Sequence, residues 1–125
     1  MKRKSGTLGK EYQDGDIIVR EGDTAHCMYE IQEGTVEVIG EKDGKEVKLA
    51  LLGKGDFFGE MAIFERELRS ASVRASGKVL ALTVDKKTLL TRISADPTLA
   101  FRLLEKMSGR IREMDREIVQ LKDSC

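Results

Sequence analysis

The sequence predicts a mainly β domain, a sandwich or barrel of short strands, followed by helices that end in one long C-terminal helix. Between Tyr12 and about Val84, short runs rich in β-branched residues alternate with glycine turns. After Val84 the hydrophobic period changes from that of strands to that of helices. The 125 residues suffice for one modest core, so we expect a single domain, residues 1–125, with its β part at about 12–84 and its helical part at about 85–122.

The predicted strands are short, and each is bounded by a turn signal. Asp43-Gly44 stands between two alternating runs, which predicts a tight two-residue hairpin. Alternation assigns Val36, Val38 and Leu49 to the core. The strands are expected at Ile17–Val19, Met28–Ile31, Val36–Ile39, Val47–Leu51 and Val79–Val84.

Two helices are predicted after the strands. Asp85 is a suitable N-cap for a helix over residues 86–93. Ser94-Ala95-Asp96-Pro97 interrupts the pattern, and Pro97 suits the first turn of a second helix that continues to Lys122. Gly109 lies alone within that helix and should cost about 1 kcal/mol relative to alanine.

Apolar residues recur along the second helix at spacings of three, four, three, four and three. This is the a/d pattern of a two-stranded coiled coil, and it predicts a parallel homodimer. The pattern covers fewer than three heptads and is marginal by itself. The alternative is a helix that packs its apolar side on its own β part. The residues of this seam are Leu104, Met107, Ile111, Met114, Ile118 and Leu121.

Composition argues against several classes of function. Lys plus Arg and Asp plus Glu number 22 each, so no global basic field attracts nucleic acid. No apolar run approaches a membrane span, and the basic start of the chain is not followed by the apolar segment of a secretory signal. Cys27 and Cys125 are far apart, which fits a reducing cytoplasm. His26 is the only histidine, so we expect neither a metal site nor a catalytic nucleophile–base pair.

The stretch from Gly55 to Val73 reads as an anion-binding loop. Gly59 lets the backbone approach a ligand closely, and the N–H groups that follow open a short helix whose positive end favours an anion. Arg69 can add a planar, two-pronged contact that matches a phosphate. The residues after it are small and leave room for a ligand.

Glu60 completes this loop with a carboxylate, which repels a phosphate and therefore suits a neighbouring hydroxyl. A phosphate, a hydroxyl and a pocket of small residues together indicate a ribose phosphate. The alternative interpretation is structural, because Glu60 and Arg69 could simply form a partly buried ion pair.

The same segment resembles the phosphate-binding cassette of cyclic-nucleotide-binding domains, as in the catabolite activator protein and the regulatory subunits of cAMP-dependent protein kinase. The matching runs are F-G-E-x-A at residues 58–62 and R-x-A-x-V at residues 69–73, with the spacing of the kinase subunits. Two further runs, G-D-x-I-x-x-x-G-D at 15–23 and Y-x-I-x-x-G-x-V at 29–36, also resemble this family. The resemblance implies an eight-stranded β-roll of jelly-roll type with a long C-terminal helix.

The resemblance also implies a ligand, cAMP or possibly cGMP, without any cofactor. Arg69 is then expected on the phosphate and Glu60 on the ribose 2′-hydroxyl. Met114 and Asp115 fall where the catabolite activator protein has the Thr and Ser that bind adenine, so base discrimination should be weak. Arg110 could reach Glu60. The implied ligand-binding residues are Gly59, Glu60, Met61, Ala62, Arg69, Ser70 and Ala71, with possible base or ribose contacts from Val38, Leu49, Arg110, Met114 and Asp115.

We therefore expect a non-enzymatic, cytoplasmic cyclic-nucleotide sensor. Its dimeric helix would report binding to an unidentified protein partner, with no role for nucleic acid or membrane in this chain. One alternative is an interaction module that kept the fold and lost the ligand. The other is the ligand-binding part of a DNA-binding regulator.

Overall fold

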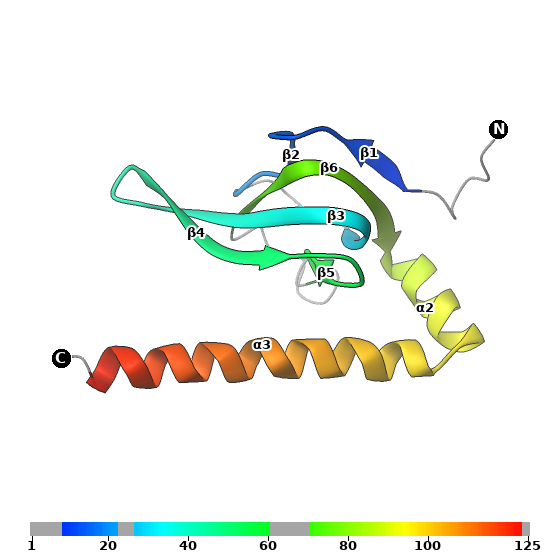
Figure 1. The fold of residues 1–125 in the computed structure, drawn as a ribbon. Helices are drawn as coiled ribbons and strands as arrows, with labels where there is room; N and C mark the ends of the chain where they lie inside the picture. The colour runs from blue at the N-terminus through cyan, green and yellow to red at the C-terminus, as the bar shows by residue number, and fades with distance from the viewer. Residues whose placement is uncertain (1–8, 23–26, 61–70, 124–125) are drawn as a thin grey trace. The chain divides into compact units, whose positions relative to one another are not determined.

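The computed structural model describes residues 9–22, 27–60 and 71–123. Contacts divide the chain into two compact units, Met1–Thr88 and Leu89–Cys125, and each is treated by itself below. The first unit is an antiparallel sheet and the second is helical (Figure 1). The predicted class, mainly β with a long C-terminal helix, is confirmed.

Two long strands form the centre of the sheet. Strands β3 (Cys27–Lys42) and β6 (Ser72–Asp85) pair antiparallel from Cys27↔Asp85 to Ile39↔Ser72. The hairpin partner β4 (Lys45–Leu52) extends β3 on its other side, so the main strand order is β1-β6-β3-β4.

Three short strands complete the six-stranded sheet in the described part of the chain. Strands β1 (Lys10–Tyr12) and β2 (Ile17–Val19) pair with β6, and β5 (Phe57–Phe58) pairs with β3. The sequence did not predict β1 or β5, because neither run is long enough to show a period.

Strand β3 corrects the predicted segmentation. The runs 28–31 and 36–39 were expected as separate strands around a turn at Glu33-Gly34, but one strand continues through both. Its register against β6 shifts between Ile31 and Glu33 and again between Glu33 and Thr35. Gly34 has φ +94°, a conformation that glycine adopts readily. The strand therefore has an irregularity at Gly34 in place of the predicted turn.

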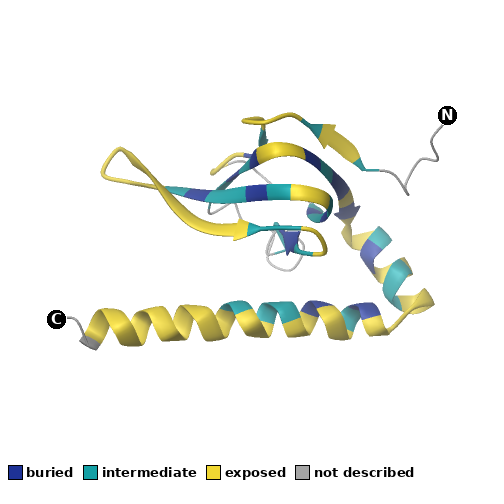
Figure 2. Ribbon diagram, viewed as in Figure 1, coloured by how far each residue is buried: buried dark blue, intermediate teal, exposed yellow. Residues whose placement is uncertain are grey.

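The core is built mainly from side chains of β3 and β6, with one residue each from β2 and β5. Figure 2 shows buried residues concentrated along these two strands. Val36 is fully buried as predicted, Val38 is half-buried, and Leu49 is 57% exposed, so assigning Leu49 to the core was wrong. The principal core cluster comprises Val19, Ile31, Val36, Phe58, Val73, Ala75, Val79 and Ala81.

Both predicted helices are present in the structure. Helix α2 (Lys86–Ala95) begins where predicted, because the Thr88 N–H donates to Asp85 Oδ1 over 2.7 Å and caps the first turn. Hydrogen bonds from the Thr98 N–H and hydroxyl to Asp96 Oδ1, 3.2 and 2.6 Å long, precede helix α3 (Thr98–Asp123). Neither described helix is long and apolar enough to cross a membrane.

Candidate functional site

The first arm of the predicted cassette is anchored to β3 by aromatic packing. Phe57 and Phe58 are buried on β5, which pairs with Tyr29 and Glu30. The rings of Tyr29 and Phe58 stack with centroids 4.9 Å apart and planes 8° from parallel. The backbone that enters the cassette is therefore fixed one residue before Gly59.

Gly59 and Glu60 follow directly from this anchor. Gly59 has φ +79°, in the left-handed region that favours glycine, so the chain changes direction there without the strain of a Cβ atom. Glu60 is half-buried. The positive φ explains why a glycine suits this position, while the close approach of its backbone to a ligand and the partner of the Glu60 carboxylate remain predictions.

The second arm of the cassette returns to the same strand. Ala71 is half-buried, and Ser72 and Val73 open β6, where they pair with Ile39 and Val38. Both ends of the cassette thus pair with β3, Phe58 with Tyr29 and Ser72 with Ile39, which are ten residues apart on that strand. The residues at each end of the cassette are therefore fixed on the sheet, at two separate points of β3.

The middle of the cassette carries four of the predicted ligand contacts. Met61, Ala62, Arg69 and Ser70 all lie outside the described residues. Their roles, and the alternative Glu60–Arg69 ion pair, stay predictions.

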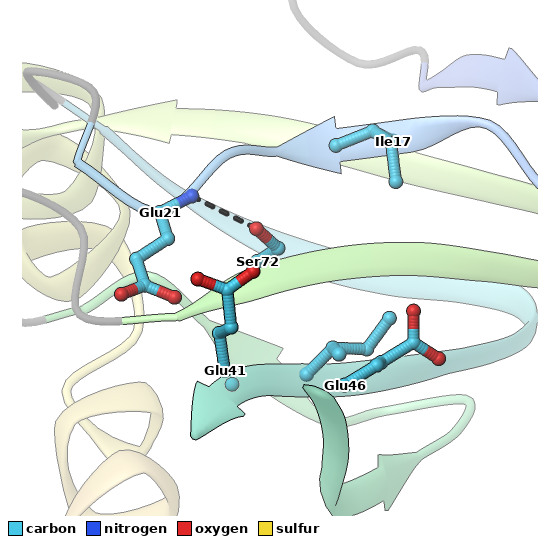
Figure 3. Close-up of a pocket in the computed structure, with 7 residues that line it drawn as sticks. Ile17, Glu21, Glu41, Glu46 and Ser72 are labelled. Atoms are coloured by element: carbon cyan, nitrogen blue, oxygen red, sulfur yellow. Dashed lines mark hydrogen bonds between the residues drawn. The ribbon is translucent and has the colours of Figure 1, made fainter. Parts of the chain in front are cut away.

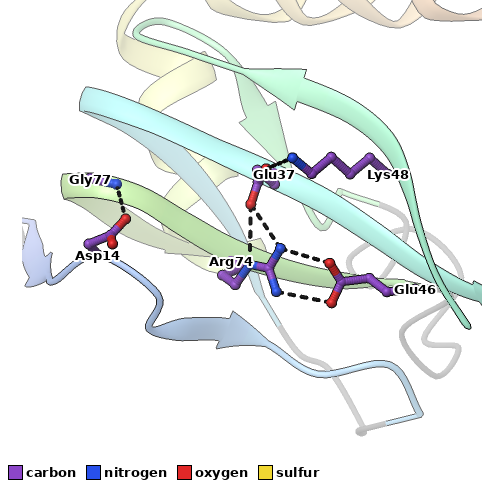
Figure 4. Close-up of polar contacts among 6 residues, drawn as sticks. All are labelled: Asp14, Glu37, Glu46, Lys48, Arg74 and Gly77. Carbon is purple, nitrogen blue, oxygen red and sulfur yellow. Dashed lines mark hydrogen bonds and ion pairs between the residues drawn. The ribbon is translucent and has the colours of Figure 1, made fainter.

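Arg74, close to the end of the cassette, is engaged by carboxylates of neighbouring strands (Figure 4). Its Nη1 and Nη2 atoms bind both oxygens of Glu46 at 3.0 and 2.9 Å, and Nη2 lies 3.0 Å from Glu37 Oε1. Lys48 Nζ contacts the other Glu37 oxygen at 2.8 Å. Because Arg74 already has two carboxylate partners, it is a poor candidate for binding a phosphate. Arg69 therefore stays the arginine that we expect on the phosphate.

The same contacts perturb the titration of these carboxylates. Hydrogen bonds from Lys48 and then Arg74 hold the pKa of Glu37 below its ordinary value, and those from Arg74 lower the pKa of Glu46. The two glutamates raise the pKa of Arg74 in turn. The network therefore links β3, β4 and β6 by charge-assisted hydrogen bonds beside the second arm of the cassette.

Val38 and Leu49, the predicted ribose or base contacts, lie on one face of the β3–β4 hairpin. Val36, Val38 and Gly40 alternate along β3. A Cβ atom on Gly40 would lie 3.1 Å from Leu49 Cδ1, so the Leu49 side chain covers Gly40 on the same side. The register shift between Val38 and Ile39 places Leu49 opposite no residue of β3. An apolar surface thus continues the core outward along the hairpin.

A cavity of about 220 Å³ opens beside this hairpin (Figure 3). Ile17 and Ile39 contribute apolar surface, and the Glu21 N–H donates to Ser72 Oγ over 2.9 Å at one side. Three carboxylates, of Glu21, Glu41 and Glu46, line it. They repel an anion, so this cavity is not the expected phosphate site.

The remaining predicted contacts belong to the helical unit. Arg110 is half-buried, and Met114 and Asp115 are exposed, all on α3. Their approach to the nucleotide stays a prediction.

The described residues contain no group of three or more His, Cys, Asp or Glu side chains arranged for a metal ion, and His26 lies outside them.

Comparison with known proteins identifies the family. Residues 9–96 match the cyclic nucleotide-binding domain. The chain is 43% identical over 82 residues to the cAMP-dependent protein kinase type II regulatory subunit of Drosophila melanogaster, covering 66% of this chain and 22% of that protein. It is 31% identical over 113 residues to the cAMP-activated global transcriptional regulator CRP of Salmonella typhimurium, covering 89% of this chain and 54% of that protein.

Solved structures agree with these sequence matches. The catabolite activator protein of Thermus thermophilus superposes with a TM-score of 0.79 at 32% identity, over 90% of this chain and 54% of that one. The cGMP-bound form of the EAL enzyme Bd1971 gives a TM-score of 0.64 at 35% identity, over 87% of this chain and 29% of that one. The chain spans between about a fifth and about half of the curated relatives that it matches here. With a match that covers residues 9–96 of the 125, this chain belongs to the cyclic nucleotide-binding domain family.

Proposed function

We propose that this chain is a regulatory module that binds a 3′,5′-cyclic purine nucleotide in the cassette between Gly59 and Ala71. The observation that carries the proposal is the anchored cassette itself. Both arms are fixed on β3, Gly59 adopts a left-handed conformation that favours glycine, and Glu60 follows it directly. The family match and the cAMP-regulated relatives support the same ligand class.

In this proposal Arg69 binds the exocyclic phosphate oxygens, together with backbone N–H groups near Gly59, Met61 and Ala62. Loss of Arg69 leaves the phosphate unpaired in a partly desolvated site. This should weaken nucleotide binding by roughly 3 kcal/mol, or about a hundredfold in affinity. Calorimetry with cAMP on Arg69→Ala tests this. Arg74→Met is the matched control, because Arg74 is already paired with Glu37 and Glu46 and its loss should leave the affinity of the folded protein nearly unchanged. Equal effects of the two substitutions would place the phosphate elsewhere.

Glu60 is proposed to accept a hydrogen bond from the ribose 2′-hydroxyl. A site built around a hydroxyl discriminates against its absence, because the carboxylate then loses its partner. The 2′-deoxy analogue of cAMP should bind the native protein more weakly than cAMP, and Glu60→Ala should remove that difference. Equal affinity of the native protein for both nucleotides contradicts the assignment.

Discrimination between adenine and guanine should be weak. Met114 offers only packing to a purine edge, and Asp115 can accept from an amino group that both bases carry. The EAL enzyme Bd1971, a structural relative, has been solved in a cAMP-bound and a cGMP-bound form, which supports a tolerant base site in this part of the family. Parallel titrations with cAMP and cGMP test this, and a preference above about a hundredfold, some 2.7 kcal/mol, contradicts it.

The output of the module is proposed to be a homodimer through α3. Five of the six seam residues are at least half exposed, and Met107 is half-buried. An apolar stripe of that length on a helix is typical of an interface. Arg110, one residue before seam residue Ile111, would couple the cassette to this seam through Glu60. Nucleotide would then shift an existing equilibrium of helix positions by its difference in affinity for the two states, without a catalytic step.

Charges placed in the seam test the dimer. Ile111→Asp with Ile118→Asp should give monomers in light scattering that still bind nucleotide, because buried carboxylates in an apolar interface are costly. Val119→Asp is the control, since Val119 is equally exposed on α3 and lies outside the seam. A doubly substituted protein that stays dimeric would move the interface away from α3.

A further inference from the structure

Strand β4 forms one edge of the described sheet. Among the described strands it pairs with β3 alone, and every residue from Lys45 to Leu51 is exposed (Figure 2). An edge strand presents a row of backbone N–H and C=O groups that can pair with another strand, and proteins often prevent such pairing by keeping edge strands very short. Strand β4 has 8 residues. Its outer edge is therefore a surface to which a further strand can add.

The geometry of the hairpin decides which residues of β4 direct their backbone groups to this edge. A two-residue turn with positive φ at both residues joins Lys42 to Lys45, and these two residues share the closing hydrogen bond of such a turn. Hydrogen-bonded and non-hydrogen-bonded pairs alternate along an antiparallel ladder. Glu46 and Lys48 are therefore in non-hydrogen-bonded pairs with β3, and their own N–H and C=O groups point outward.

The side chains of the same two residues carry opposite charges. Glu46 and Lys48 are two positions apart, so both lie on one face of the hairpin, where Arg74 and Glu37 hold them (Figure 4). The side chain of Lys48 is 69% exposed and that of Glu46 is 51% exposed. Because a carboxylate has about four acceptor sites and an ammonium group has three donors, each can make a further contact across the edge.

We infer that the outer edge of β4 binds β4 of a second copy of this chain, antiparallel, around a two-fold axis at Val47. Glu46 of each copy then lies opposite Lys48 of the other, and these two pairs exchange hydrogen bonds through their outward backbone groups. Val47 lies opposite Val47 of the second copy, on the other face. This inference goes beyond the proposed nucleotide binding and requires neither that binding nor the α3 dimer.

Charge selects this register among those that the outward backbone groups allow. In the antiparallel register shifted one way, Glu46 would face Glu46 of the second copy, and in the one shifted the other way Lys48 would face Lys48. Like charges directly opposite each other in a sheet are destabilising, whereas opposite charges stabilise the pair. Glu46 and Lys48 therefore disfavour both neighbouring registers and favour the one centred on Val47.

The contact involves few residues and is weak, with a Kd of about 0.1–1 mM. Light scattering at micromolar concentration therefore does not detect it. Where the proposed α3 dimer also forms, the β4 contact is a second two-fold interface and links dimers into larger assemblies at high local concentration.

Disulfide crosslinking of the whole chain tests the position of the two-fold axis. In a non-hydrogen-bonded antiparallel pair the two Cα atoms lie about 4.5 Å apart, which is within the range of a disulfide. In a background of Cys27→Ser and Cys125→Ser, mild oxidation of Val47→Cys at high protein concentration should therefore give a linked dimer. Leu51→Cys is the matched control, because it is also exposed on β4 but its two copies would lie about 26 Å apart along the strands.

The two cysteine variants give opposite results only if the pairing is antiparallel and centred on Val47. Crosslinking should be at least about tenfold slower for Leu51→Cys than for Val47→Cys. Equal rates, as expected from random collision or from a parallel pairing in register, overturn the inference, and so does the absence of a crosslink at Val47→Cys. The crosslink should persist when Ile111→Asp and Ile118→Asp are added, and its loss there would assign the proximity to α3.

Charge exchange tests the register in the Val47→Cys protein. Glu46→Lys alone and Lys48→Glu alone each place two like-charge pairs in the dimer, and each should slow crosslinking about tenfold at low salt. In a mixture of the two variants, the introduced lysine faces the introduced glutamate, and native Lys48 faces native Glu46. The mixed dimer should therefore crosslink at about the rate of the parent. Circular dichroism checks that both variants are folded, and a mixture that crosslinks no faster than either variant by itself overturns the pairing of Glu46 with Lys48.

Discussion

Replacing Gly34 by alanine places a methyl group where β3 passes close to β6. A Cβ atom at this position would lie 2.3 Å from the backbone oxygen of Lys78, 3.0 Å from Val79 Cα and 3.1 Å from Val79 Cγ2. Favourable contacts between non-bonded heavy atoms are about 3.5–4.0 Å long, so the first distance requires the backbone of β6 to move. Val79 is 1% exposed in the core, so the strand has little room to move.

Two costs add at this residue. The φ of +94° is unfavourable for an L-residue and costs roughly 1–2 kcal/mol. Forcing an additional carbon into a packed region typically costs another ~1–3 kcal/mol. The free energy of unfolding should fall by roughly 2–5 kcal/mol, which at about 4 °C per kcal/mol for a chain of this size lowers Tm by roughly 8–20 °C.

Gly15→Ala is the matched control. Gly15 has a similar φ of +87°, but no described atom lies within 4 Å of a Cβ atom there. Gly15→Ala should lower the free energy of unfolding only by the backbone cost, roughly 1–2 kcal/mol. Urea and thermal unfolding followed by circular dichroism measure both variants. If Gly34→Ala and Gly15→Ala destabilise the protein equally, the close crossing of β3 and β6 at Gly34 is refuted, and with it the explanation of why β3 is one strand.

Three further predictions concern the helix, the ion-pair network and the anchor of the cassette. Gly109→Ala should stabilise α3 by about 1 kcal/mol, because no described atom within 4 Å meets the new methyl group; an unchanged Tm would contradict this. The lowered pKa of Glu37 means that its ionised form stabilises the fold above its ordinary pKa of about 4.5, and that this contribution is lost as pH falls through the lower pKa of the folded state. Arg74→Met should therefore reduce the dependence of Tm on pH below about 4.5, and an identical acid profile would remove Arg74 from this role. Phe58→Ala should cost roughly 3–5 kcal/mol, because Phe58 is 3% exposed and stacked on Tyr29, and should weaken cAMP binding in the remaining folded protein; full affinity by calorimetry would show that β5 does not position Gly59.

Local sequence chemistry determined a large part of this protein. Asp43-Gly44 predicted a two-residue hairpin, and both residues have the positive φ values, 55° and 75°, that a type I′ turn requires. Asp85 predicted the start of α2 because its side chain can reach an N–H three residues later. The cassette motif predicted the family from residues 58–73. These features depend on neighbours in the chain, so the sequence states them directly.

The tertiary structure decided what depends on strands meeting across the sheet. Arg74 pairs with Glu37 and Glu46, which are 37 and 28 positions away, and no local pattern distinguishes it from the other arginines. Leu49 alternates like a core residue, but every residue of β4 from Lys45 to Leu51 is exposed, so alternation in this strand does not mark a core face. The sequence predicted a turn at Gly34. In the structure β6 lies directly against Gly34, which keeps this residue within the continuous strand β3. Register between distant strands is fixed by the packing of the whole core, so it follows from the fold and cannot be read from any single segment.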